Sequence, residues 1–284
     1  MAASSHGLDA SHGCAHLTGP LCVATASEAH LRRSWLSSDP LLRRHGIRYL
    51  QLGGDTWNRC GPGWLNADAA YDAGDGVPRP NKIVTDLETG RKIMRHEISA
   101  TSRLPFSDGS VQLVYSEHML EHMLPVTGGG INFLREAYRI LAPGGVLRIV
   151  TPDLAKYVCA LVEPSSSFLN RHGRRFPPME RMGAADGTPR AEPSPTRAGV
   201  VNNIFRNYGH QWIYDFDELR HALRKAGIDP KHACRSDRSG RGMPRWAAAV
   251  LHRANEPRNR TLTCWLDQPV REDESMYVVL TKPG

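Results

Sequence analysis

The sequence lacks long apolar runs. No stretch of its 284 residues approaches the ~18 consecutive apolar residues that a membrane-spanning helix requires, so we expect no membrane partner. The first thirty residues contain neither Lys nor Arg, and therefore lack the positive segment that opens a secretory signal. We interpret residues 1–30 as a disordered tail and predict a soluble, cytoplasmic protein. The Ser-rich, acid-poor start leaves organelle targeting open.

Cysteine is sparse and scattered. The chain has six cysteines, and none lies in the C-x-x-C pairs typical of a structural zinc site. So few cysteines in a chain of this length also argue against a disulfide framework. We therefore predict reduced thiols in an intracellular compartment.

Strand-like and helix-like segments alternate along the chain. Strand patterns lie at 47–52, 64–67, 82–85, 111–115, 146–150 and 276–280, and helical patterns at 31–44, 116–123, 131–141 and 216–226. This alternation predicts an α/β fold with a doubly wound, mostly parallel sheet. Hydrophobic residues make up 40% of the chain, which is enough to build a core.

One long segment interrupts this pattern. Pro, Ser, Gly and Arg dominate residues 163–206. A structureless segment of this length inside a domain is either a functional lid or disordered. It divides the predicted domain into a first part at 31–162 and a C-terminal part at 207–284.

The first two strand ends carry residues suited to a ligand. Gly53, Gly54 and Asp55 follow the first strand, and residues without a Cβ let a ligand approach the backbone. Asp68 follows the second strand, where a carboxylate can accept hydrogen bonds from a ribose diol. Since open α/β sheets bind ligands outside the carboxyl ends of their strands, we expect a ribose-containing ligand at this edge.

Four ordered segments carry a family resemblance: IRYLQLGGD, GPGWLNADA, LPFSDGSVQLVYSEHMLEHM and FLREAYRILAPGGVLRIVTPDL. Together they resemble the class I S-adenosylmethionine-dependent methyltransferase superfamily, most closely the subgroup described as methyltransferase type 11. The resemblance covers residues 47–161 and resumes at 209–227 and 274–277. It implies a Rossmann-like methyltransferase fold with a seven-stranded sheet, an insertion or lid after the fifth strand, and S-adenosyl-L-methionine as cofactor.

The resemblance also implies where this cofactor lies, with 31–162 as the cofactor-binding half. Gly53, Gly54 and Asp55 should wrap its methionine part, and Asp68 should hold the ribose. The other cofactor-binding residues that it implies are Ala69 beside Asp68, Ala100 and Leu104 at the adenine, Tyr115, Ser116 and Glu117 beside the sulfonium, and His122 beneath the cofactor.

Three positions depart from the family pattern: Asp55 in the glycine loop, Ser99-Ala100 before LPF, and Val111-Gln112 at the start of a strand. A chain can keep a fold without keeping its activity. A catalytically inactive methyltransferase-fold binding protein is therefore the alternative function.

The segment from His118 to His122 has the H-x-x-E-H spacing of an inverted zinc-protease motif, provided that it is helical. A metal-dependent hydrolase is accordingly a third hypothesis. Some quinone-pathway O-methyltransferases carry a similar E-x-x-E-H helix, so a divalent ion on an acceptor hydroxyl is a further option. We expect no metal, because such a site needs more identified ligands, and we interpret His122 as packing under the cofactor.

Methyl transfer requires a positioned acceptor and, for a hydroxyl or an amine, a group that removes a proton. His118 is the first candidate catalytic base and His210 the second, since imidazole titrates near neutral pH. Trp212 and Tyr214 follow His210 closely and are the candidate substrate-binding wall.

The net charge and the absence of certain motifs limit which class of methyl acceptor we expect. The net charge of +7 would help the chain approach nucleic acid, but no run combines dense basic residues with stacking aromatics. The sequence also has no N-P-P-Y-like tetrapeptide after the 111–115 strand and no Pro-Cys pair. We therefore predict a small-molecule methyl acceptor, modified at oxygen or nitrogen, and no nucleic-acid partner.

Overall fold

The computed structural model describes residues 35–54, 60–69, 80–87, 89–163, 165–176, 196–255, 264 and 266–284. The predicted tail at 1–30, Asp55, and residues 177–195 of the predicted insertion lie outside this part of the chain. No helix in the described part is both long enough and apolar enough to cross a membrane.

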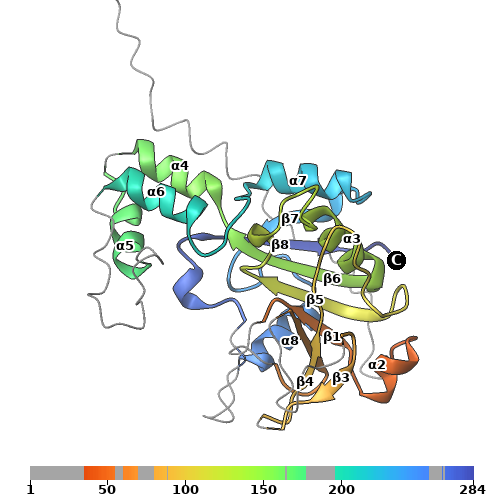
Figure 1. The fold of residues 1–284 in the computed structure, drawn as a ribbon. Helices are drawn as coiled ribbons and strands as arrows, with labels where there is room; N and C mark the ends of the chain where they lie inside the picture. The colour runs from red at the N-terminus through yellow and green to blue at the C-terminus, as the bar shows by residue number, and fades with distance from the viewer. Residues whose placement is uncertain are drawn as a thin grey trace, which may run out of the picture.

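One mixed sheet organises the molecule (Figure 1). Its strands are β1 (Tyr49–Leu52), β2 (Trp64–Asp68), β3 (Ile83–Thr85), β4 (Lys92–Arg95), β5 (Val111–Glu117), β6 (Leu141–Pro152), β7 (Ala233–Ser236) and β8 (Ser275–Thr281). They lie in the order β3-β4-β2-β1-β5-β6-β8-β7. The neighbours β4, β2, β1, β5 and β6 are all parallel, whereas β8 runs antiparallel to both β6 and β7. This is the predicted doubly wound, mostly parallel α/β fold.

The sheet has eight strands where seven were expected. The predicted strand at 82–85 forms as β3, but it pairs antiparallel with β4 at the sheet edge. The inner position next to β2 belongs instead to β4, with Asn66 opposite Ile93. Only Ile93 and Met94 of β4 are buried, and so short an apolar stretch between basic residues gives little strand signal in the sequence.

Helices cover both faces of the sheet. They are α2 (Pro40–Arg44), α3 (Gly130–Ile140), α4 (Leu154–Val162), α5 (Phe168–Arg175), α6 (Arg197–Arg206), α7 (Phe216–Lys225) and α8 (Arg245–Ala254), with short 3₁₀ turns η2 (Leu120–His122), η4 (Pro230–His232) and η5 (Pro269–Arg271). The predicted helix at 31–44 is helical only from Pro40 in its described part, because Asp39 caps the N-terminus there.

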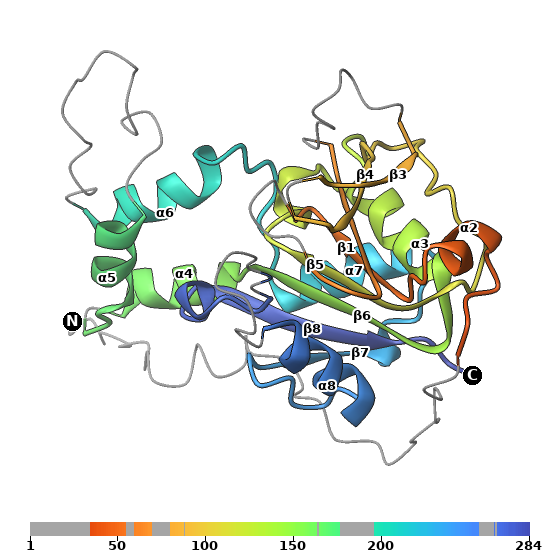
Figure 2. The same ribbon diagram turned by 90° about the horizontal axis from the view of Figure 1, so that it is seen from below.

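Alternating side chains build two cores, one on each face of the sheet. Val114 packs with α3 and α7 in the larger core, while its neighbours Leu113 and Tyr115 pack with α8 in the other. In β8, Val278 faces the first core and Val279 the second. This period of two is what a strand buried on both faces requires, and Figure 2 shows α8 on the side of the sheet away from α3 and α7.

Helices α4, α5 and α6 gather beside the end of the sheet in both views (Figures 1 and 2). Tyr157, Leu169, Val200 and Ile204 bury their side chains together in a separate small core. The described residues of 163–206 form helices, so the interpretation of this segment as disordered is wrong for them, while its role as a lid stays a prediction. A few apolar residues spaced among many Arg, Ser and Pro are enough to pack α5 and α6, although they give a weak periodic signal.

The cysteines also contradict the sequence-based expectation. Cys60 and Cys264 form a disulfide, and Cys159 and Cys234 are disulfide-bonded as well. No described cysteine is free. Cys60 and Cys264 are 204 positions apart, so their spacing gave no indication of the pair. The predicted reduced thiols are wrong for all four described cysteines.

Candidate functional site

The carboxyl edge of the parallel strands begins at a glycine turn. Gly53 directly follows β1 with φ of +76°, a conformation that favours glycine. Its N–H donates to the carbonyl oxygen of Ala67 at 3.0 Å, and β1 and β2 run parallel with Leu52 opposite Ala67. Gly53 and Asp68 therefore lie side by side at this edge, as the sequence predicted.

Ser116 joins the same edge from the neighbouring strand, since it lies opposite Leu52 in the β1–β5 register. The Met119 side chain covers the space between the two strands. A Cβ added to Gly53 would lie 2.6 Å from Met119 Sδ, and Ser116 Oγ donates to that sulfur at 3.7 Å. Gly53 is thus required twice, once for its backbone conformation and once for the close approach of Met119.

Other predicted cofactor residues differ in their access. Gly54 is buried behind the turn, while Ala69 and Ala100 are exposed. Leu104 is only 2% exposed and packs in the larger core. Its N–H donates to Glu136 at 2.9 Å, so the side chain of Leu104 serves the core while its backbone is fixed from α3.

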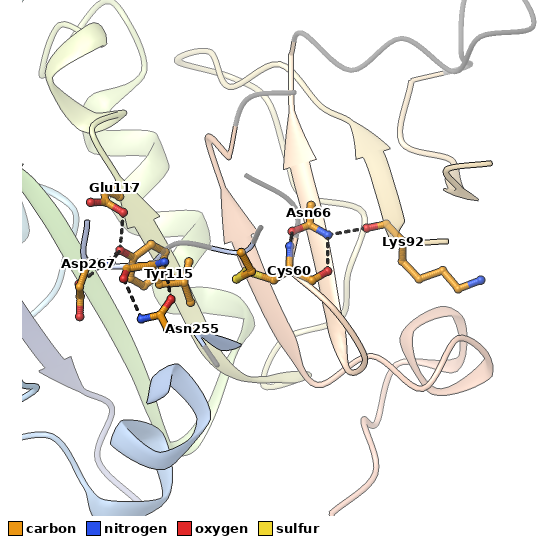
Figure 3. The surroundings of a disulfide bond; sticks show 9 residues. Cys60, Asn66, Lys92, Tyr115, Glu117, Asn255 and Asp267 are labelled. Carbon is orange, nitrogen blue, oxygen red and sulfur yellow. Dashed lines mark hydrogen bonds between the residues drawn. A yellow bond between two sulfur atoms is a disulfide. The ribbon is translucent and has the colours of Figure 1, made fainter. Parts of the chain in front are cut away.

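Tyr115 and Glu117 lie together beside Asp267 (Figure 3), and the alternation of side chains along β5 places both on the face opposite to that of Ser116. Tyr115 is fully buried in the α8 core, and its hydroxyl donates to Glu117 Oε2 at 2.7 Å. Glu117 Oε1 accepts from the N–H of Gln268 at 3.0 Å. Burial raises the pKa of Glu117. The two side chains thus support the strand end from below, and of the predicted residues 115–117 only Ser116 faces the glycine turn.

These edge residues fit a nucleoside-bearing methyl donor. The turn at Gly53 leaves backbone where a side chain would collide, and Asp68 supplies a carboxylate at the end of the adjacent strand. A close backbone approach beside an acidic residue is the arrangement that a ribose-containing ligand requires at such an edge. The glycine turn, Asp68 and Ser116 are therefore the residues that could hold the cofactor.

The segment after β5 is not the helix that the sequence predicted. Strand β5 continues through Glu117, His118 adopts φ of +48°, and only Leu120–His122 form a single 3₁₀ turn. His118 and His122 therefore do not share one face of an α-helix. The zinc-protease interpretation of the H-x-x-E-H spacing requires such a helix, so the structure does not support it.

His118 lies between hydroxyl and carboxylate groups. Its Nε2 is 2.8 Å from Ser275 Oγ, and its Nδ1 is 3.1 Å from Glu121 Oε1. Burial lowers the pKa of His118, but the Glu121 carboxylate outweighs it, so the pKa of His118 is raised above its usual value. Both ring nitrogens are engaged, which leaves neither free to take a proton from an acceptor.

Glu121 is the centre of a buried group of histidines. It is fully buried, and Thr151 Oγ1 donates to its Oε2 at 3.0 Å. Burial raises the pKa of this carboxyl, but His118 and the two other nearby histidines, His122 and His210, lower it further, to about 2. Glu121 is therefore an anion at neutral pH, held inside the protein by imidazoles rather than by Arg or Lys.

His210 and His122 complete this group from opposite sides. The His210 Nδ1 is 2.7 Å from the carbonyl oxygen of Ile204, and its Nε2 is 3.8 Å from Glu121 Oε1. The His122 ring meets the His210 ring edge-on, with 4.9 Å between centroids. Burial lowers the pKa of His210. One ligand atom from each of Glu121, His122 and His210 lies within 4.8 Å of the others.

The two predicted substrate-binding aromatics have different environments. Trp212 is 41% exposed and lines a pocket of about 300 Å³ together with Leu124, Ile131 and Lys225. Its backbone N–H donates to the Glu121 carbonyl oxygen at 3.1 Å, so this pocket adjoins the buried histidine group. Tyr214 is fully buried, its backbone bridges to Asp153 beside β6, and its side chain belongs to the core.

The sequence reasoning missed the acidic partner on the far side of His118. Glu274 Oε1 lies 3.9 Å from His118 Nε2, while Glu274 also accepts from Tyr157 at 2.8 Å and pairs with Arg271 at 2.7 Å. These contacts connect the histidine group to α4 in the helical lobe. The signal was present, since Glu274 and Ser275 lie in a segment that carries the family resemblance, but the sequence does not give its contact with His118.

One family model matches part of the chain. Residues 60–149 match the family model of a methyltransferase domain, so the resemblance to S-adenosylmethionine-dependent methyltransferases is confirmed over that range. S-adenosyl-L-methionine is the cofactor that this family implies. The matched range runs from the disulfide cysteine Cys60 to Ile149 in β6 and leaves the glycine turn just outside it. No curated protein matches the chain.

Several solved structures are similar to this chain at low identity. An S-adenosylmethionine-dependent methyltransferase from Mesorhizobium loti aligns with 86% of this chain and 96% of its own, at 16% identity and a TM-score of 0.36. One from Archaeoglobus fulgidus aligns with 84% and 87%, at 12% identity and a TM-score of 0.39. A possible exported protein from Bordetella parapertussis aligns with 86% and 65%, at 14% identity and a TM-score of 0.39. Likenesses this distant carry no conclusion about substrate or activity.

Proposed function

We propose that this chain is an S-adenosylmethionine-dependent methyltransferase that modifies an oxygen or nitrogen of a small-molecule acceptor. The observation that carries the proposal is the edge formed by the positive-φ Gly53, the neighbouring Asp68 and Ser116. The methyltransferase-domain match over residues 60–149 supports it independently.

The cofactor, when bound, supplies a methyl carbon on a sulfonium sulfur, which the acceptor atom displaces so that the carbon–sulfur bond breaks with its electron pair left on sulfur. The chain's own residues have to hold the two reactants in line. Asp68 binds the ribose, and the backbone of the glycine turn binds the methionine part. Met119 packs against Gly53 and so bounds this site.

We propose that Trp212 positions the methyl acceptor. Its partly exposed indole lines the apolar pocket next to the Glu121 segment, and Glu218 fixes the ring by accepting from Nε1 at 3.0 Å. Tyr214 has no access to that pocket. His118 has both nitrogens engaged and His210 is 5% exposed and directed at Glu121. The proposal therefore gives the two histidines the task of organising the site, and leaves the acceptor's proton to solvent.

Calorimetric titration with S-adenosylmethionine and with S-adenosylhomocysteine tests the cofactor part. Wild type should bind both, whereas Asp68→Ala should bind at least tenfold more weakly and Gly53→Arg not at all. Asp217→Ala, at an exposed carboxylate on α7, is the matched control and should bind like wild type. Failure of wild type to bind either compound at millimolar concentration would remove the proposal.

A catalytically inactive binding protein is the second candidate, favoured by the family departures at Ser99-Ala100 and Val111-Gln112. The two functions differ in one measurement. An acceptor screen that follows release of S-adenosylhomocysteine should show turnover for the enzyme, with a loss in Trp212→Ala that appears mainly in KM. Tight cofactor binding with no turnover across hydroxyl, amine and carboxylate acceptors would favour the inactive relative.

A further inference from the structure

We propose that Glu121, His122 and His210 form a binding site for a divalent transition-metal cation, with Zn²⁺ as the expected ion. One ligand atom of each residue lies within 4.8 Å of the others. Glu121 and His122 come from the turn after β5, and His210 comes from the segment after α6. The inference goes beyond methyl transfer, and stands or falls separately from it.

The hydrogen-bond partner of His210 fixes which of its two ring nitrogens carries the hydrogen. The Ile204 carbonyl oxygen can only accept, so His210 Nδ1, 2.7 Å away, must carry the hydrogen. In the neutral ring, Nε2 then presents a lone pair, and it faces Glu121 Oε1 at 3.8 Å. A backbone carbonyl that fixes one nitrogen and so directs the other is the usual outer contact of a metal-binding histidine.

The Glu121 carboxylate offers a second ligand atom, Oε1. Glu121 Oε1 is buried and has no hydrogen-bond partner among the described residues, although Oε2 is satisfied by Thr151. His118 Nδ1 forms an ion pair with Oε1 at 3.1 Å, which engages one side of this oxygen. A carboxylate oxygen has a second lone pair, and no donor among the described residues fills it. Two acceptors, Glu121 Oε1 and His210 Nε2, thus face each other, and a cation between them would satisfy both.

The donor set selects the kind of ion. Two imidazoles and one carboxylate suit Zn²⁺ or Fe²⁺, whereas Mg²⁺ and Ca²⁺ prefer oxygen ligands. Three protein ligands leave at least one coordination position open, as in catalytic zinc sites. The backbone already brings the two segments together, because Gln211 and Trp212 both donate to the Glu121 carbonyl oxygen, at 2.8 and 3.1 Å. The ion would therefore bind to a site that is formed in advance.

Zinc binding by tag-free protein tests the site. The full chain is stripped with a chelator, titrated calorimetrically with zinc chloride alone, and analysed for bound metal. Wild type should hold one equivalent at this site, and His210→Ala should bind it at least tenfold more weakly. His221→Ala removes an exposed histidine on α7 and should match wild type. No zinc binding by wild type, or unchanged binding in His210→Ala, would overturn the proposal.

Two further measurements keep the result interpretable. The N-terminal histidines His6, His12 and His16 also bind metals in principle, so the relevant signal is the part that His210→Ala and His122→Ala each abolish. Loading with Co²⁺ should give visible absorption bands that both variants lose while their far-ultraviolet spectra stay unchanged. Glu121→Gln should behave likewise if it folds. Bands that persist in both histidine variants would place the metal elsewhere and contradict the assignment.

The outcome is separable from that of the proposed function. Binding of S-adenosylmethionine without zinc would remove this site and leave the methyltransferase proposal standing. Zinc binding without any affinity for S-adenosylmethionine would do the reverse.

Discussion

Arg148 and Asp267 form an ion pair inside the second core, with Arg148 Nη2 2.8 Å from Asp267 Oδ2 and Nε 3.1 Å from Oδ1. Arg148 is fully buried in β6, and its guanidinium lies over the Tyr277 ring at 5.0 Å. The Asp267 N–H donates to the Tyr115 hydroxyl oxygen, and the Tyr115 hydroxyl donates to Glu117 (Figure 3). The pair therefore supports, from beneath the sheet, the strand end that carries Ser116.

Asp267→Ala should lower the free energy of unfolding by about 3–5 kcal/mol, because it leaves a buried guanidinium without its counter-charge. Urea denaturation followed by circular dichroism measures this change. The double variant Arg148→Met/Asp267→Leu, which removes both charges, should cost less than Asp267→Ala. An equal loss in both variants would mean that the pair contributes through packing alone.

Asp39 should make a contribution to the free energy of unfolding that decreases at acidic pH. Its carboxylate accepts from the N–H groups of Leu41, Leu42 and Ser107. Burial raises the pKa of Asp39, but these hydrogen bonds outweigh it and the folded-state pKa lies below the usual 3.8. Since the unfolded chain binds the proton more readily, this stabilisation is present above the unfolded pKa and is lost as the pH falls through the folded one.

Asp39→Ala should therefore cost about 1–2 kcal/mol at pH 7, the usual size of a lost N-cap, and less at pH 3, which lies below the usual pKa of 3.8. Denaturation curves of both proteins at the two pH values measure the difference. Asp217→Ala is the control and should show little change at either pH. A gap between wild type and Asp39→Ala that stays constant with pH would contradict the assigned role.

The Cys60–Cys264 disulfide should contribute about 2–5 kcal/mol, because it restricts the unfolded chain. A Cys60→Ala/Cys264→Ala variant should melt at a lower temperature than wild type without reductant. Peptide mapping of a non-reduced digest should show Cys60 joined to Cys264, and Cys159 and Cys234 protected from alkylation. Alkylation of all four in native, non-reduced protein would refute the pairing.

Two glycines allow the cofactor edge to be tested against backbone strain. Gly46 and Gly53 both have positive φ, but a Cβ at Gly46 would meet nothing within 4 Å, while one at Gly53 would meet Met119 at 2.6 Å. Gly46→Ala should cost about 1 kcal/mol in stability and leave cofactor affinity unchanged. Gly53→Ala should lower affinity for S-adenosylmethionine at least tenfold. Equal effects of the two substitutions on affinity would deny Gly53 its place in the site.

The strands were predictable where both of their faces are covered. The segments 111–115 and 276–280 are apolar apart from Gln112, as strands buried on both faces are. The edge hairpin of β3 and β4 was only half predicted, since β4 buries just Ile93 and Met94. Helices α5 and α6 pack through only a few apolar residues. The composition of this segment therefore suggested a structureless stretch, although its described residues form helices.

The site was predictable only where the ends of parallel strands bring its residues together. Gly53, Asp68 and Ser116 meet because parallel strands end at one edge, which the alternation of strands and helices implies. The contact of Glu121 with His210 depends on how the segment after α6 returns to β5, and no local pattern encodes that return. The family resemblance implies a cofactor role for Tyr115 and Glu117 from their positions alone. Side chains alternate along a strand, so both lie on the face of the sheet opposite to that of Ser116.

The last strand in the sequence lies inside the sheet rather than at its margin. Strand β8 fills the gap between β6 and β7, so β6 keeps an open row of backbone groups until residues 275–281 have been synthesised. Until then the middle of the sheet carries unpaired strand edges, which can pair with another chain. Changes that break β8 pairing therefore act on the interior of the sheet rather than on its margin.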